Sequence, residues 1–503
     1  MPDLVHNLAL GFSVAFSAQN ILLCLIGCFV GTLIGVLPGI GPLATIAILL
    51  PITFHTEPVG SLIMLAGIYY GAQYGGSTTA ILVNMPGEAS SVMTTLDGHA
   101  MARQGLAGKA LGIAAISSFA AGTFATLVVA ALAIPLARFA LSFGPGQYFA
   151  LMILGLVLAL VLAGGGLLKA FAMLVLGVLM ALAGADMVTA QARLTFGLPQ
   201  LYDGFDVAIL AMGLFGIAEV LRNLDQTERR PSVRTTVGRL LPGRAELRQA
   251  APAMIRGSLL GTMLGVLPGN GAVLAPFAAY SLEKSVAKEP ERFGKGAIEG
   301  VASPEAANNA AAQTTFIPLL TLGIPSTAAM ALMDGAMTLH GILPGPRVLN
   351  THPDLFWGMV TSMWIGNAML LIINLPLIGL WVRLLQVPYR LLFPMIVLVC
   401  CIGIYSVNQQ PGDVIQVGLF GLAGYLFWKL KLEPAPLLLG FVLGRLLEDN
   451  LRRGLVLSRG SVVTFLSEPT TLVLLLVAAL VLAGSIVPRM RSRRAALLAD
   501  EGR

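Results

Sequence analysis

The chain has 503 residues, of which 56% are hydrophobic and 11% are charged, and its mean hydropathy is +0.84. Soluble domains carry about a quarter charged residues, so this composition excludes an ordinary soluble protein and predicts a membrane protein. The formal net charge of +6 comes mainly from one internal loop and the C-terminal tail, and the loop lacks the interleaved aromatic residues of a nucleic-acid-binding surface. We therefore expect a lipid bilayer, and no nucleic acid, among the partners.

The N-terminal residues, MPDLVHNLAL, lack the basic flank that precedes the apolar core of a cleaved signal peptide. We therefore expect the first helix to be retained. Asp3, and the absence of Lys and Arg before the first apolar run, favour a periplasmic N-terminus.

Apolar runs follow one another along the chain, each near the ~20 residues that cross a hydrocarbon core. They lie near 20–37, 58–83, 110–134, 147–163, 167–183, 206–221, 253–267, 355–380, 391–407, 414–430 and 468–487. Two interrupted stretches, around 310–333 and 435–446, are candidates for re-entrant segments. The predicted fold is an all-α polytopic membrane protein with about ten to thirteen membrane elements, because open sheet edges are not tolerated in lipid.

An eleven-residue motif, the repeated phrase, occurs twice in the chain, as GTLIGVLPGIG from Gly31 and as GTMLGVLPGNG from Gly261. Eight of the eleven positions are identical at an offset of 230 residues. Further segments match at offsets between 236 and 239 residues: GGSTT, NMPG and DGHAM follow the first copy, and QTT, IPST and DGAM follow the second. This pattern predicts two duplicated, inverted repeats with broken or re-entrant helices.

Each phrase ends in a Pro-Gly-x-Gly sequence that is expected to stop or unwind its helix, because Pro removes a backbone hydrogen bond and Gly allows a sharp turn. At membrane depth the freed backbone groups must be buried in protein or line a wet cavity. Half-helix N-termini suit carboxylates, and half-helix C-termini suit Na⁺. Small residues also serve close helix packing, which is the preferred interpretation for Gly31, Gly35, Gly261 and Gly265.

A basic loop divides the chain into two halves. Seven arginines lie between Arg222 and Arg248, and four more lie in the tail from Arg489 to Arg494, so both segments are expected in the cytoplasm. The predicted organisation is a first membrane repeat at 1–221, a basic cytoplasmic loop at 222–248, a second membrane repeat with additional helices at 249–487 and a basic cytoplasmic tail at 488–503.

The candidate substrate-binding residues are the two breaks and the polar residues that recur after them. They are Pro38, Gly39, Gly41, Ser77, Thr78, Thr79, Asn84, Pro268, Gly269, Asn270, Gly271, Asn308, Asn309, Gln313, Thr314, Thr315, Pro325, Ser326 and Thr327. The candidates for ion coupling are Glu88, Asp97, Glu305 and Asp334. Two alternatives are open: hydroxyls in membrane helices often bond their own backbone, and each carboxylate could lie at a membrane boundary.

Enzymatic chemistry and nucleotide hydrolysis have little support in the sequence. The segment GLAGKA from Gly105 lacks the spacing and the hydroxyl of a phosphate-binding loop. The five histidines are scattered without metal-ligand spacing, and the four cysteines lack the spacing of zinc or redox motifs. We expect no enzyme activity, no bound metal and no cofactor beyond Na⁺ or H⁺ as the coupling ion.

At these residues the chain resembles the large membrane subunit of the tripartite tricarboxylate transporters, the TctA type. The resemblance covers nearly the whole chain and is closest at GVLPGIGP from Gly35, YGGSTTAILVNMPGEASSVMTTLDG from Tyr74, GKALG from Gly108 and PEAANNAAAQTTFIPLLTLGIPS from Pro304. It implies a small membrane subunit and a periplasmic solute-binding protein as partners, the bacterial inner membrane as location, and uptake of organic carboxylates with a cation gradient. Gln313-Thr314-Thr315 and Ser326 depart from the family's usual pattern and leave the carboxylate unidentified.

The mechanism expected for such a protein is a composite site near the midplane, where the two breaks meet. Backbone N–H groups and hydroxyls would hold the substrate carboxylates, and Na⁺ or H⁺ would balance their charge. The alternative is a structural or channel-like membrane subunit without coupled transport. A structural subunit would tolerate replacement of Asn308 and Asn309, and a channel would show rings of charge or a long polar stripe.

Overall fold

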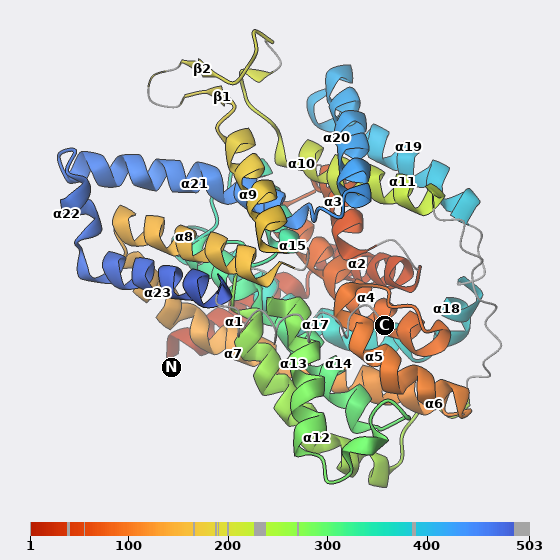
Figure 1. The fold of residues 1–503 in the computed structure, drawn as a ribbon. Coiled ribbons are helices and arrows are strands. Elements are labelled where there is room, and N and C mark those ends of the chain that lie inside the picture. Colours follow the sequence, from red (N-terminus) through yellow and green to blue (C-terminus); the bar gives the residue numbers. More distant parts are fainter. Residues whose placement is uncertain are drawn as a thin grey trace.

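The computed structural model describes residues 2–37, 41–54, 56–163, 166–186, 189, 191–198, 201–225, 238–268, 271–384 and 389–486. Within these ranges the chain is almost entirely helical, with one two-stranded antiparallel hairpin in which Gly184 pairs with Arg193 (Figure 1). The all-α architecture predicted from hydropathy is confirmed at this level. The number of elements that cross the bilayer, the domain boundaries and the inverted arrangement of the repeats stay predictions.

The elements of the first half, in chain order, are α1 (Pro2–Ala15), α2 (Ala18–Val36), α3 (Pro42–Thr53), α4 (Pro58–Val83), η1 (Ala89–Ser91), α5 (Val92–Thr94), η2 (Thr95–His99), α6 (Ala100–Arg103), α7 (Ala107–Leu141), α8 (Pro145–Leu162), α9 (Leu167–Ala181), β1 (Gly184–Ala185), β2 (Ala192–Arg193), α10 (Val207–Ala211), η4 (Met212–Ile217) and α11 (Ala218–Asp225).

The elements of the second half are α12 (Arg244–Gly265), α13 (Gly271–Val286), η5 (Pro290–Arg292), α14 (Glu299–Thr314), η6 (Pro318–Leu322), α15 (Ala328–Leu339), α16 (Val348–Thr351), α17 (Pro353–Asn374), α18 (Ile378–Leu384), α19 (Tyr389–Asn408), α20 (Pro411–Lys429), α21 (Ala435–Leu457), α22 (Val462–Leu466) and α23 (Pro469–Ile486).

Among the described residues, five helical segments are long and apolar enough to cross a membrane. They are Ala18–Val36, Ala107–Leu141, Pro145–Leu162, Val207–Asp225 and Pro353–Asn374. Shorter apolar helices accompany them, including α3, α9 and α15. Because a helix rises about 1.5 Å per residue, the 12-residue α3 spans about 18 Å and is shorter than the ~30 Å hydrocarbon core.

Helices α2 and α4 pack at backbone contact. A Cβ atom at Gly27, Gly31 or Gly35 of α2 would collide with a backbone carbonyl of α4, at residues Met64, Ile68 and Ala72 in turn. Residues four apart lie on one face of a helix, so the three glycines form a continuous groove that receives α4.

Helices α12 and α14 repeat this contact. Gly257, Gly261 and Gly265 of α12 face the carbonyls of Ser303, Ala307 and Ala311 of α14 in the same order. The glycines correspond to those of α2 at the offset of 230 residues, and the facing carbonyls correspond at an offset of 239. The packing role predicted for Gly31, Gly35, Gly261 and Gly265 is confirmed.

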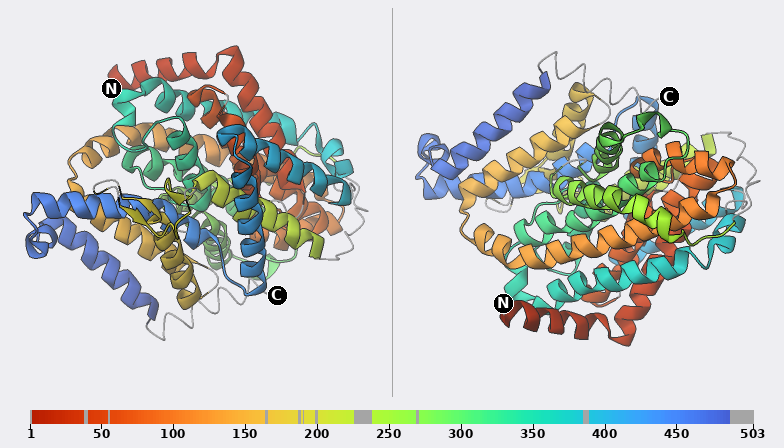
Figure 2. Two further views of the ribbon diagram at one scale, coloured as in Figure 1. Left: turned by 90° about the horizontal axis from the view of Figure 1, so that it is seen from above. Right: turned by 90° about the horizontal axis from the view of Figure 1, so that it is seen from below.

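The two helix pairs meet in the middle of the molecule. Helix α14 packs against α7 and also contacts α4, while α17 packs against α4, α7 and α2 (Figure 1). Helix α1 lies along α17 at the edge of the molecule in both views of Figure 2. Helices α8, α21 and α23 form a separate layer to one side. The interior seam between α4, α7, α14 and α17 carries the polar residues described next.

Candidate functional site

A cluster of buried polar side chains fills the seam between α4, α7 and α14. Helix α4 contributes Tyr69, Gln73 and Ser77, which lie on one face because they are four residues apart. Helix α14 contributes Glu305, Asn308 and Asn309, and α7 contributes Ser118, all of them buried. In an apolar protein such a cluster is costly to build and marks a functional site.

Glu305 is the centre of the cluster and is only 1% exposed. Its Oε2 accepts hydrogen bonds from Ser77 at 2.8 Å and from Ser118 at 3.2 Å, and its Oε1 accepts one from Thr94 at 2.5 Å. The amide of Asn309 donates to the Ser118 hydroxyl at 2.7 Å. The carboxylate therefore joins α4, α5, α7 and α14 through neutral hydroxyl groups alone.

Glu88 is the second carboxylate and follows the end of α4. Its Oε1 accepts a hydrogen bond from the Ser90 hydroxyl and a longer one, 3.5 Å, from the Asn308 amide. Ser90 also lies 3.0 Å from the side-chain oxygen of Gln73. Tyr69 interacts with Gln73 and with Thr315 and so adds a further contact between the two halves.

Neither carboxylate forms an ion pair with a Lys, Arg or His in the described part of the chain. Removing an ionised carboxylate from water costs many kcal/mol unless a charge or several donors compensate it. Glu305 and Glu88 also act on each other as like charges. The cluster is therefore suited to hold a cation or a proton, and it is unsuited to hold an anion directly.

Two further helix interruptions, distinct from the Pro-Gly-x-Gly sequences, have the same backbone geometry and are called the first break (residues 84–88) and the second break (residues 323–327) from here on. Helix α4 ends at Asn84 in the left-handed conformation, with φ 57°, and the chain resumes at Glu88, an extended N-cap with φ −151°. The second break begins where η6 ends, at Gly323 with φ 72°. It ends at Thr327, the N-cap of α15, with φ −140°. A Pro lies two residues after each left-handed residue. These positions correspond at the same offset of 239 residues.

The second break is closed by its own hydroxyls. Ser326 donates to the Thr315 carbonyl at 3.0 Å, and the Thr327 hydroxyl accepts from the Met330 N–H at 3.2 Å as the N-cap of α15. Pro325, which precedes them, is buried. Asn84, at the first break, is exposed.

The tips of the two repeated phrases lie only partly within the described residues. Pro38, Gly39, Gly269 and Asn270 lie outside them, so the predictions for these four residues stay open. Gly41 is the N-cap of α3, and Gly271 begins α13.

The residues beside each tip lie against a break. Gly35, at the end of α2, faces Gly87 of the first break. In the second half, a Cβ atom at Gly155 of α8 would contact both Pro268, beside the second tip, and Ile324 of the second break, at 3.7 and 3.8 Å. Gly35 and Pro268, the described residues beside the two tips, therefore each lie near the break of their own half.

Several predicted hydroxyls bond their own helix, as the alternative interpretation held. Thr78 donates to the Tyr74 carbonyl at 3.3 Å, Thr314 to Ala310 at 3.1 Å and Thr315 to Ala312 at 2.7 Å. Thr79 donates to Gly76 at 2.9 Å. Gln313 is buried, and its side-chain oxygen has no partner among the described residues.

Asp97 is held by a fixed cage of donors. Its Oδ1 accepts the N–H groups of Gly294, Gly296 and Ala297 at 2.9, 2.8 and 2.7 Å, and its Oδ2 accepts the Tyr280 hydroxyl at 2.9 Å. The side chain thus fastens η2 to the loop that leads into α14. This geometry indicates a structural anion.

Asp334 stands apart from these contacts. It lies on α15 and forms no hydrogen bond or ion pair with another described residue. Nothing in its surroundings links it to the cluster around Glu305.

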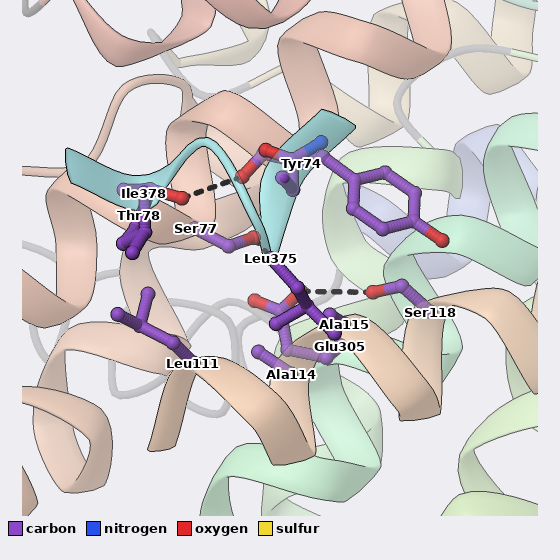
Figure 3. A pocket seen from close by; sticks show the side chains of 11 residues that line it. Tyr74, Ser77, Thr78, Leu111, Ala114, Ala115, Ser118, Glu305, Leu375 and Ile378 are labelled. Carbon is purple, nitrogen blue, oxygen red and sulfur yellow. Dashed lines mark hydrogen bonds between the residues drawn. The ribbon is translucent and has the colours of Figure 1, made fainter. Parts of the chain in front are cut away.

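A small cavity opens beside Glu305, between α4, α7, α14 and the end of α17 (Figure 3). Its volume is about 20 Å³, and its polar lining consists of Tyr74, Ser77, Thr78, Ser118, Glu305 and Asn374. A cavity of this size holds about one water-sized particle. It is too small for a tricarboxylate.

Ser118, Thr94 and Asn374 were not among the residues singled out from the sequence. Ser118 lies in a run of small residues, where a hydroxyl carries no distinctive signal. Asn367 and Asn374 did offer one, because two asparagines seven residues apart fall on one face of an apolar membrane helix.

The chain matches a known family and related sequences. A model of the tripartite tricarboxylate transporter TctA family matches residues 21–439. An uncharacterized 52.8 kDa protein in the TAR-I ttuC' 3' region of Agrobacterium vitis is 54% identical over 502 residues, 100% of each chain. An uncharacterized protein in the TAR-II ttuC' 3' region of the same organism is 56% identical over 234 residues, 46% of this chain and 97% of that protein. No solved structure gives a significant match.

Proposed function

The chain belongs to the tripartite tricarboxylate transporter TctA family, and on this premise we propose that it is the large membrane subunit of a binding-protein-dependent, cation-coupled importer of tricarboxylates or related organic carboxylates. The proposed partners are a small membrane subunit and a periplasmic solute-binding protein, and the proposed location is the bacterial inner membrane. The observation that carries the proposal is the Glu305 cluster, which holds two carboxylates that pair with no Lys, Arg or His side chain among the described residues.

The charge of this cluster supports coupling to a cation. A carboxylate substrate bound beside this seam would add negative charge near Glu88 and Glu305. In a medium of low dielectric constant, like charges a few ångströms apart repel by several kcal/mol. Entry of Na⁺ or H⁺ removes this repulsion, so substrate and cation bind together more favourably than the substrate alone.

The two breaks at residues 84–88 and 323–327 are the proposed substrate-binding region. Both combine unwound backbone with side chains that donate and accept hydrogen bonds, which suits a carboxylate, and the cavity beside Glu305 is too small for one. The glycine contacts that recur at offsets of 230 and 239 residues, together with the matched breaks, support an origin of the two halves by duplication.

Uptake into proteoliposomes tests the proposal. The purified chain, its small membrane subunit and a cognate binding protein are given labelled di- and tricarboxylates, with an inward Na⁺ gradient, an inward H⁺ gradient or neither. We expect uptake that requires one gradient and the binding protein. Abolishing the gradient with an ionophore is the matched control.

Two results would contradict the proposal. Uptake that runs equally well without any gradient would indicate a channel, and the absence of uptake under every combination would indicate a structural subunit.

A further inference from the structure

The cavity beside Glu305 presents oxygen atoms whose hydrogen-bonding protons are already used. The Ser118 hydroxyl donates to Glu305 at 3.2 Å, and the Ser77 hydroxyl has two acceptors for its proton, Glu305 at 2.8 Å and the Gln73 carbonyl at 3.1 Å. A hydroxyl has one proton and two lone pairs, so either donation leaves Ser77 with two lone pairs, and Ser118, which also accepts from the Asn309 amide at 2.7 Å, keeps one. Together with the carboxylate they form a set of hard oxygen ligands that carries one negative charge.

Asn374 supplies an unpaired acceptor to the same cavity. It is 5% exposed, its amide nitrogen donates to the Leu370 carbonyl at 2.9 Å, and its Oδ1 has no partner among the described residues. A buried acceptor without a partner costs about 1–3 kcal/mol, and among the described residues with such an unpaired buried atom Asn374 is the one that lines the cavity.

Asn367, two turns earlier on α17, gives the contrast. Its Oδ1 accepts the Tyr74 hydroxyl at 2.9 Å, and its Nδ2 donates to the Phe119 carbonyl at 2.8 Å. Its hydrogen-bonding capacity is thus satisfied within the protein. Of the two asparagines on this face, only Asn374 lines the cavity and leaves its oxygen unused.

We propose that this cavity is a binding site for one Na⁺ ion, with the Glu305 carboxylate, the Ser77 and Ser118 hydroxyls and the Asn374 amide oxygen as ligands. The proposal rests on the proposed cation-coupled function and assigns the cation of that function to a place. Hard cations take oxygen ligands, and one carboxylate balances one monovalent charge. A volume of about 20 Å³ accommodates one monovalent cation and excludes the organic substrate.

Equilibrium binding of ²²Na⁺ to the purified full-length chain in detergent tests the site without any substrate or binding protein. We expect saturable binding of one ion that excess unlabelled Na⁺ displaces and excess K⁺ does not. Glu305→Gln removes the charge and is expected to abolish binding. Ser118→Ala and Asn374→Leu each remove one ligand and are expected to weaken binding about tenfold.

Ser117→Ala is the matched control, because Ser117 is the preceding residue on α7, is equally buried and does not line the cavity. It is expected to leave binding unchanged. The melting temperature of every variant in Na⁺-free buffer establishes that each has folded. A Ser117→Ala effect equal to that of Ser118→Ala would overturn the assignment.

The binding and uptake experiments distinguish a failure of the proposed Na⁺ site from a failure of the proposed transport function. Carboxylate uptake driven by a proton gradient, with no saturable ²²Na⁺ binding, would overturn the Na⁺ site and leave the transporter standing. Site-dependent ²²Na⁺ binding without carboxylate uptake under any gradient would support the site and remove the proposed function.

Discussion

Two buried carboxylates of this protein, Asp97 and Glu305, differ in the donors that surround them. Asp97 is bound by three backbone N–H groups and a tyrosine hydroxyl. Backbone N–H groups are permanent donors and cannot turn a lone pair toward a cation. Glu305 is bound by three side-chain hydroxyls, which can rotate. A fixed cage suits structure, and a rotatable one suits the exchange of a cation or proton.

Asp97→Ala is predicted to destabilise the protein by at least about 3 kcal/mol, because it leaves several buried donors without an acceptor. Asp97→Asn keeps one carbonyl-type oxygen for the N–H groups and is predicted to cost less. The melting temperature of the purified chain measures both effects. In proteoliposomes, uptake per folded protein should stay near that of the wild type for Asp97→Asn. A loss of cation-dependent uptake without a loss of stability would contradict the structural role.

At the scale of elements, the close pairs α2/α4 and α12/α14 depend on glycine rows. Gly31→Ala places a methyl group against the Ile68 carbonyl, and Gly261→Ala places one against the Ala307 carbonyl. Each is predicted to destabilise the protein by about 1–3 kcal/mol through overpacking. Both should be seen as a lower melting temperature.

Gly418→Ala in α20 is the control for these variants. A Cβ there meets no atom within 4 Å, so the change only removes the flexibility of a helical glycine. It is predicted to raise stability by about 0.5–1 kcal/mol. If Gly31→Ala behaved like Gly418→Ala, the packing argument would be wrong.

At the scale of the whole molecule, the end of the basic loop and the start of α12 connect the second half to the first through contacts with α7. Backbone carbonyls of Arg239 and Leu240 lie against Gly108 and Gly112 near the start of α7. Beside them the Lys109 ammonium contacts the Glu246 carboxylate of α12 at 2.6 Å. The ion pair therefore joins the first turns of two helices that are 137 residues apart in sequence.

The hydrogen bond from Lys109 lowers the pKa of Glu246 below its ordinary value. A lowered pKa contributes stability above the ordinary value of 4.5, and this stability is lost as the pH falls through the folded-state value. Because the pair is partly exposed, its contribution is predicted to be at most about 1 kcal/mol. Melting temperatures of the wild type and Lys109→Met should differ slightly at pH 7 and converge below pH 4. A difference that grows on acidification would contradict this.

The sequence predicts helices, repeats and several members of the cluster, because these depend on local pattern. Ser77, Asn309 and Glu305 stand out as polar residues within apolar or Ala-rich runs, and the structure brings them into contact. Ser118 and Asn374 depend on which helices become neighbours, which no local pattern encodes.

Asp97 is a residue whose type is evident from the sequence but whose surroundings are not. Its residue type near a predicted break suggests ion coupling, and only the tertiary structure reveals the backbone donors that surround it.

The glycine rows also restrict how the protein can move. Backbones in direct contact along three successive turns cannot slide past each other without collision, so α2 with α4 and α12 with α14 each behave as one stiff strut. Side chains, by contrast, fill the polar seam between α4 and α14, and their hydroxyls can exchange partners. We predict that a change of shape that exposes the site to one side of the membrane and then the other would involve movement at this seam. By making the pairs α2/α4 and α12/α14 rigid, the glycines leave the seam between α4 and α14 as the place where movement is expected.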